Sequence, residues 1–138
     1  MSTKLPSVSC VIATYNSSTT IKQCLESVFS QNYPKDKLEV IIVDGGSKDN
    51  TLEILKDFRV RLYKVPPRLQ EAEYNKGVGV THVKSELILF IDHDNILTHK
   101  NWLRNMVRPL VENAEIAGAE VLRFHYNSIR FCHSHIVF

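Results

Sequence analysis

Two carboxylates separated by one residue, Asp92 and Asp94, are the clearest chemical feature of this sequence. They directly follow residues 86–91, a short apolar run that predicts a buried strand. Two carboxylates at a strand end can reach one hard cation, and Mg²⁺ is typically held by one or two carboxylates while substrate phosphates complete its shell. The pair therefore indicates a site for Mn²⁺ or Mg²⁺, or else a turn in which the aspartates cap backbone groups.

A second carboxylate, Asp44, follows the apolar run 38–43 and precedes Gly45 and Gly46. Paired glycines allow a ligand to approach the backbone closely, and a carboxylate there can accept a hydrogen bond from a nucleobase or a ribose hydroxyl. A turn aspartate before a helix is the alternative. Tyr15, which follows the first apolar run, could stack on a base or lie in the core.

The elements that must position these residues alternate along the chain. Apolar, β-branched runs predict strands, and the segments between them carry apolar residues at helical spacing. The predicted strands are residues 8–13, 38–43, 60–65, 86–91 and 116–124, and the predicted helices are residues 21–29, 49–57, 77–83 and a segment from residue 100. Residues 66–77 (PPRLQEAEYNKG) are predicted to form a loop that leads into the third helix, and residues 122–138 an irregular tail.

This order predicts an α/β fold in one domain spanning residues 1–138, with a core over residues 7–121. Strands that are separated by helices of about ten residues pair in parallel through right-handed crossovers. This arrangement places helices on both faces of an open, Rossmann-like sheet. Ligands bind beyond the carboxyl ends of such strands. The polar residues after the first, second and fourth strands should therefore meet at one rim.

Composition excludes several classes of protein. With 43% hydrophobic and 23% charged residues, the chain has the profile of an ordinary globular protein. A net charge of +2 and the lack of a Lys/Arg run argue against a nucleic-acid partner. Cys10, Cys24 and Cys132 show neither disulfide nor zinc spacing. No segment has the apolar length of a signal peptide or a membrane span, so we expect a cytoplasmic location, with peripheral membrane attachment left open.

Three segments occur in an order that resembles the family 2 glycosyltransferases. They are VSCVIATYNSSTTIKQCLESVFSQNYP, LEVIIVDGGSKDNTLEIL and NKGVGVTHVKSELILFIDHDN, within residues 7–121. The resemblance implies a GT-A-type α/β fold, truncated relative to a full GT-A domain and corresponding to its N-terminal nucleotide-sugar-binding portion. It also implies transfer of a sugar from a nucleotide-diphospho sugar, most often a UDP-sugar, to a hydroxyl acceptor with inversion.

The resemblance also implies roles for individual residues. Ala13, Thr14 and Tyr15 would lie near the nucleobase, and Asp44 would be its hydrogen-bond partner. Lys76 stands close to the place of a basic residue that the family carries before its D-x-D strand, or it is a solvated surface lysine.

Asp92 and Asp94 match the D-x-D motif of the family. By resemblance, Asp92 would lie toward the ribose and the metal, and Asp94 would ligate the Mn²⁺ or Mg²⁺ ion that bridges the two phosphates. Such a metal offsets the charge on the departing nucleoside diphosphate.

The resemblance ends before the acceptor region. The later carboxylates, Glu112, Glu115 and Glu120, do not fit the family's general base, so no catalytic residue is assigned. His133 and His135 could add a metal ligand or be incidental. The chain is therefore either an enzyme or a non-catalytic nucleotide-sugar-binding module or fragment. In either case a second copy of the chain or a partner subunit could supply the acceptor site.

Two other enzyme classes fit less well. A sugar-phosphate nucleotidyltransferase needs a glycine-rich, basic loop after the first strand, and TYNSSTT has neither glycine nor a basic residue. A receiver domain needs an acidic pair at that position.

Overall fold

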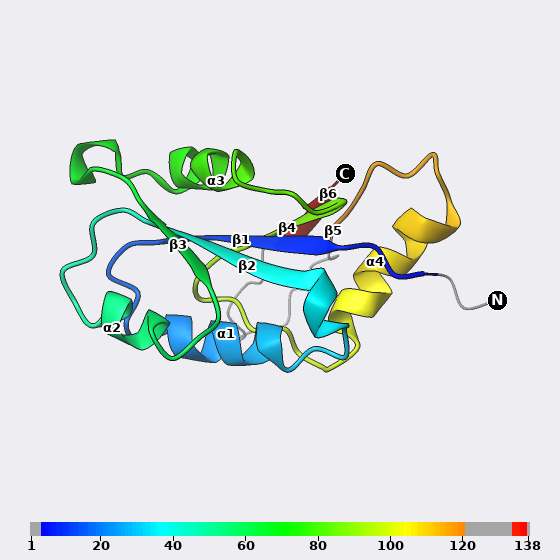
Figure 1. Ribbon diagram of the computed structural model, residues 1–138, viewed down its shortest axis with the longest axis horizontal. Helices are drawn as coiled ribbons and strands as arrows, with labels where there is room; N and C mark the ends of the chain where they lie inside the picture. The colour runs from blue at the N-terminus through cyan, green and yellow to red at the C-terminus, as the bar shows by residue number, and fades with distance from the viewer. Residues whose placement is uncertain (1–3, 121–133, 138) are drawn as a thin grey trace, which may run out of the picture.

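The computed structural model describes residues 4–120 and 134–137, which form a sheet with helices packed on both faces (Figure 1). The strands are β1 (Val8–Thr14), β2 (Leu38–Asp44), β3 (Arg61–Lys64), β4 (Leu87–Ile91), β5 (Gly118–Glu120) and β6 (Ser134–Val137). The helices are α1 (Ile21–Phe29), α2 (Thr51–Leu55), α3 (Ala72–Val80) and α4 (Trp102–Glu112), with 3₁₀ turns η1 (Lys35–Lys37) and η2 (Pro67–Leu69).

The six strands lie in the order β3-β2-β1-β4-β6-β5. The first four are parallel, and β6 is antiparallel to both of its neighbours. The predicted open, mainly parallel α/β sheet is thus confirmed. Register places Thr14 opposite Asp44 at the ends of β1 and β2, so polar residues after these strands share one edge of the sheet.

Alternate residues of the strands face two different hydrophobic layers. Cys10 and Ile12 of β1 join the larger core cluster together with residues of α1 and α4. Val11 joins a smaller cluster to which Val78 of α3 contributes. Figure 1 shows α3 on one face of the sheet and α1 with α2 on the other. Every residue of β1 is buried, as its continuous apolar run predicted for a strand covered on both faces.

Helix α3 lies close to the sheet because Gly79 faces it. A Cβ atom at this position would lie 2.5 Å from Cγ1 of Val11 and 3.3 Å from Cγ2 of Val43. The first distance leaves no room for a methyl group and the second is tight, so the absence of a side chain sets how near the helix comes to β1 and β2.

The prediction for α3 was wrong in its boundaries. The helix spans Ala72–Val80, so it begins five residues before the predicted 77–83 and takes up part of the predicted loop. Only Asn75 and Gly79 are buried in it. The buried residues of α3 are thus one polar residue and one glycine, and the half-buried Val78 alone makes no apolar stripe, so hydrophobic periodicity could not reveal the helix.

The prediction of an irregular tail over 122–138 was wrong for Ser134–Val137, which form β6 between β4 and β5, and the rest of that range lies outside the described residues. Four residues are too few to show a periodic pattern, and this strand is defined by partners distant in sequence, as in the pairing of Ile136 with Leu89. His133 and the side chain of His135 lie outside the described residues, so the structure does not test whether they could add a metal ligand.

Candidate functional site

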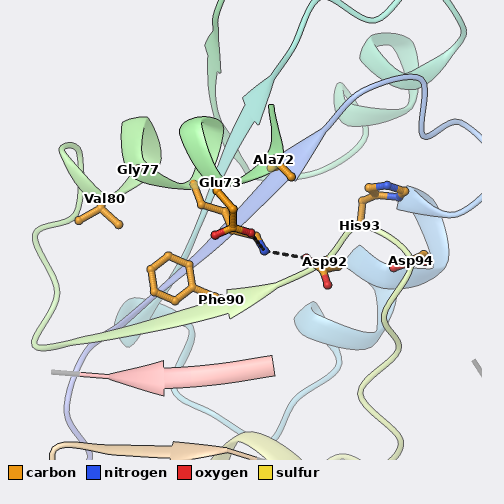
Figure 2. A pocket seen from close by; sticks show the side chains of 10 residues that line it. Ala72, Glu73, Gly77, Val80, Phe90, Asp92, His93 and Asp94 are labelled. Atoms are coloured by element: carbon orange, nitrogen blue, oxygen red, sulfur yellow. Dashed lines mark hydrogen bonds and ion pairs between the residues drawn. The ribbon is translucent and has the colours of Figure 1, made fainter. Parts of the chain in front are cut away.

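An open cleft of about 810 Å³ lies at the carboxyl ends of β1 and β4, beneath α3 (Figure 2). Its lining residues come from α3, from the end of β1 and from the end of β4 and the turn after it. They are Ala13, Ala72, Glu73, Lys76, Gly77, Val80, Phe90, Asp92, His93 and Asp94. The cleft therefore lies where the rule for parallel sheets expects a ligand.

Asp92 and Asp94 reach this cleft because β4 ends at Ile91, which is fully buried, and the chain then turns. The N–H of Asn95 donates to the carbonyl of Asp92 at 3.0 Å, so the segment does form a turn. The two carboxylates nevertheless line the cleft, and Asp94 is exposed to solvent. The turn predicted from the sequence is therefore present, and the metal site at these two carboxylates stays a prediction.

Lys76 extends from α3 toward these carboxylates. Its Nζ lies 2.9 Å from Oδ1 of Asp92 and 3.1 Å from Oε1 of Glu73. Burial opposes the charge on Lys76, but hydrogen bonds and ion pairs with Asp92 and Glu73 outweigh it and raise the pKa of the ammonium group. The side chain is only 17% exposed, so Lys76 belongs to the cleft and is not a solvated surface residue.

His93 stands between the two aspartates in sequence and also lines the cleft. Its Nδ1 shares a hydrogen bond of 3.0 Å with Oγ1 of Thr20, the residue before α1. This contact ties the turn after β4 to the start of α1 and holds the imidazole ring at the rim. Figure 2 shows the ring beyond Asp92, on the side away from Phe90.

Of the residues predicted to lie near the nucleobase, the structure brings only Ala13 to the cleft, where it is 8% exposed. Thr14 is buried, and its hydroxyl donates to Oδ1 of Asp44 at 3.2 Å. Tyr15 is exposed but is not among the residues that line the cleft. The positions of Thr14 and Tyr15 near a base stay predictions.

Asp44 is fully buried and does not line the cleft. Its Oδ2 accepts hydrogen bonds of 2.9 Å from the N–H groups of Gly46 and Ser47. Its Oδ1 accepts from the hydroxyls of Thr14 and Ser47. Gly46 has φ of +91°, a left-handed conformation that favours glycine and turns these N–H groups toward the carboxylate. This geometry makes Asp44 the organiser of its own turn, and its contact with a nucleobase stays a prediction.

On α3 the sequence predicted Lys76 as a site residue but missed Glu73, Ala72 and Val80 as residues of the cleft. Ala72, Glu73, Lys76 and Val80 recur at the three- and four-residue spacing of one helical face, and all four line the cleft. That spacing was visible in the sequence. It had no meaning there because the helix was expected to begin only at residue 77.

The carboxylates at the end of β4 fit a divalent cation that binds together with a substrate. Within residues 4–120, no three His, Cys, Asp or Glu side chains come together as a ligand set. Mn²⁺ and Mg²⁺ do not need one, because one or two carboxylates hold them while phosphate and water oxygens fill the remaining positions. Asp92 and Asp94 are the residues that would hold such an ion.

Solved structures with the same fold define the class of protein. The mannosyltransferase PcManGT from Pyrobaculum calidifontis, in complex with GDP-Man and Mn²⁺, matches with a TM-score of 0.79 at 24% identity, over 88% of this chain and 37% of that one. TarS 1-349 of S. aureus, in complex with UDP-GlcNAc, matches with a TM-score of 0.71 at 26% identity, over 77% of this chain and 31% of that one. The fold is that of the GT-A glycosyltransferases.

The profile of glycosyl transferase family 2 matches residues 9–135, and the chain belongs to this family of transferases. Glycosyltransferase AglE of Haloferax volcanii is 33% identical to it over 114 residues, which are 80% of this chain and 37% of AglE. The chain thus spans less than two fifths of the length of this relative. Among the described residues, no helix is both long enough and apolar enough to cross a bilayer.

Proposed function

We propose that this chain binds a nucleotide-diphospho sugar through a divalent metal and serves in transfer of its glycosyl group to a hydroxyl acceptor, with inversion at the anomeric carbon. The observation that carries this proposal is the cleft in which Asp92 and Asp94 lie beside Lys76 at the carboxyl end of β4. TarS, similar over most of this chain, has been solved with UDP-GlcNAc, which supports a UDP-sugar as the donor.

The charge of the cleft supports the metal. Three carboxylates, those of Glu73, Asp92 and Asp94, line it against the single ammonium group of Lys76. Such a cleft repels a diphosphate unless a cation enters with it. Mn²⁺ or Mg²⁺, held by Asp92 and Asp94, would supply that charge and act as a Lewis acid toward the departing diphosphate. Lys76 would bind a phosphate oxygen, and Ala13 would contact the nucleoside.

A non-catalytic nucleotide-sugar-binding module is the second candidate. Of the described carboxylates after Asp94, Glu112 lines a separate hollow with Lys4 and Lys37, and Glu115 does not line the cleft. The described residues therefore offer no general base for an acceptor apart from the cleft's own carboxylates. In this proposal residues 1–138 form one domain, and a partner subunit or a second copy supplies the acceptor site. Turnover by the isolated chain would exclude the binding module.

We also propose that the chain works in the cytoplasm, with any contact to a membrane made through a partner. The sequence supports this, since its three cysteines lack the spacing of a disulfide framework.

Calorimetric titration of the purified chain tests the donor site. UDP, GDP and their common sugar conjugates are titrated in the presence of Mn²⁺, in the presence of Mg²⁺, and again with chelator. We expect a uridine nucleotide to bind with metal and to lose measurable binding with chelator. Failure of every nucleotide to bind under all three conditions would contradict the proposal.

A further inference from the structure

Lys76 is shared between two carboxylates in the cleft. Its Nζ contacts Oδ1 of Asp92 at 2.9 Å and Oε1 of Glu73 at 3.1 Å, although the side chain of Glu73 is 80% exposed and that of Lys76 only 17%. Because Glu73 precedes Lys76 by three residues on α3, the helical geometry alone places the carboxylate of Glu73 beside the lysine. The contact with Asp92 instead joins α3 to the end of β4 across the cleft (Figure 2).

A second lysine, Lys56, has a glutamate partner at the same three-residue spacing but lies outside the cleft. Lys56 pairs with Glu53 at 2.6 Å, again three residues apart, but the two side chains are 69% and 68% exposed. Such surface pairs are screened by solvent and contribute little. Lys76 differs by its partial burial and by its second partner, Asp92, so its charge acts on the cleft rather than on the helix surface.

Asp92 cannot serve Lys76 and a divalent cation equally well. An ammonium group bonded to one oxygen of a carboxylate repels a second cation that approaches the same group, and the repulsion is stronger where solvent is partly excluded. A nucleoside diphosphate reverses this relation, because its phosphates attract the ammonium group away from the aspartate. The same lysine thus opposes the metal when no phosphate is near and favours the diphosphate once the metal is in place.

We propose that Lys76 is the internal counter-ion of Asp92, that it competes with the divalent metal for this carboxylate, and that it moves to the diphosphate when metal and nucleotide bind. Glu73 is the positioning residue that keeps Lys76 in the cleft. This inference rests on the proposed function, since it requires the metal site. Its consequence is cooperative binding, in which the nucleotide tightens the metal and the metal tightens the nucleotide to the same extent.

The test measures two affinities in each of four proteins: wild type, Lys76→Met, Lys76→Arg and Lys56→Met. Mn²⁺ affinity without nucleotide is measured from the electron paramagnetic resonance signal of free Mn²⁺, and UDP affinity at saturating Mn²⁺ is measured by calorimetry. We expect Lys76→Met to bind Mn²⁺ about tenfold more tightly and UDP about tenfold more weakly, a coupling of ordinary size. Lys76→Arg, which keeps the charge, should stay near wild type in both its Mn²⁺ affinity and its UDP affinity. Lys56→Met should also have the two affinities of wild type.

Opposite changes in the two affinities distinguish this role from a structural one, because a damaged cleft would weaken both ligands. Equal or weaker Mn²⁺ binding by Lys76→Met, with metal-dependent UDP binding retained in wild type, would overturn the competition and leave the proposed function standing. Metal-independent UDP binding in wild type would overturn both. Lys76→Gln replaces the methionine variant if thermal melting shows that the latter does not fold.

Discussion

The turns after β2 and after β4 begin alike in sequence and differ in what their aspartates do. Each starts with an aspartate at the end of a buried apolar strand: Asp44 is the last residue of β2, and Asp92 directly follows β4. Asp44 is fully buried and accepts from Thr14, Gly46 and Ser47. Asp92 and its neighbour Asp94 line the open cleft. Whether an aspartate at a strand end is used inside the fold or left open to the cleft therefore depends on how many hydrogen-bond donors surround it.

The turn after β2 also uses its second carboxylate internally. Asp49 accepts hydrogen bonds from the N–H and hydroxyl of Thr51 and from the N–H of Ser18, which link the turn to the segment before α1. The turn after β4 makes a backbone hydrogen bond from Asn95 to Asp92, and Asp92 makes its ion pair across the cleft with Lys76. One turn provides hydrogen-bond donors for its own carboxylates, and the other presents its carboxylates to the open cleft.

The largest effect expected from this contrast is that of Asp44→Ala. Removal of the buried carboxylate leaves the buried hydroxyl of Thr14 and the half-buried donors of Gly46 and Ser47 without their acceptor, so we expect the free energy of unfolding to fall by about 3 kcal/mol. Urea denaturation followed by circular dichroism measures it, with Asp94→Ala as the control that should change stability by less than about 0.5 kcal/mol. Unchanged stability together with lost UDP binding would show that Asp44 faces the nucleotide after all.

The next effect is that of Asp94→Ala on binding. Because this carboxylate is exposed in the cleft, we expect metal-dependent UDP affinity to fall at least about tenfold, or roughly 1.4 kcal/mol, while the melting temperature is kept. Calorimetry in the presence of Mn²⁺ and after chelation measures the loss. An affinity equal to wild type would remove Asp94 from the metal site.

A smaller effect is expected from Thr14→Val, which keeps the side-chain shape and removes one donor to Asp44. The loss of a buried hydrogen bond should cost about 1 kcal/mol of stability. UDP affinity should be unchanged if Thr14 serves only the turn, and calorimetry on the folded variant measures it. A clear loss of affinity at native stability would instead support the predicted position of Thr14 beside the base.

The smallest effect concerns acid. Burial opposes the charge on Asp49, but hydrogen bonds from Thr51 and Ser18 outweigh it and hold the pKa of this carboxyl well below its usual value. Its contribution to stability is present above the unfolded pKa of about 3.9 and is lost as pH falls through the lower folded pKa. Urea midpoints between neutral pH and pH 2 should therefore fall less steeply in Asp49→Asn than in wild type. Parallel curves would contradict this role.

The sequence predicted best the strands and the position of the cleft-lining carboxylates at the sheet edge. Runs such as 8–13 and 86–91 became β1 and β4, because strands covered on both faces are continuously apolar. Asp92 and Asp94 could be placed because parallel strands point their carboxyl ends to one rim. The internal role of Asp44 could not be predicted, since it depends on donors that converge only when Gly46 adopts a positive φ.

The missed elements share a different cause. The start of α3 and the strand β6 carry no periodic apolar pattern, because each is held by contacts with parts of the chain far away in sequence. Glu73 was missed as a consequence, since the helix face that it shares with Lys76 exists only once α3 is placed at Ala72–Val80.

At Gly79, helix α3 approaches β1 and β2 closely, and this contact affects the width of the cleft although Gly79 does not line it. Lys76 lies one helical turn before Gly79, so whatever sets the height of α3 above Val11 and Val43 also sets the gap between Lys76 and Asp92. A single methyl group at position 79 would wedge the helix away from the sheet and widen that gap without touching any residue of the lining. If the cleft holds a sugar nucleotide, as proposed, the size that it accepts depends on the face of α3 that packs on the sheet.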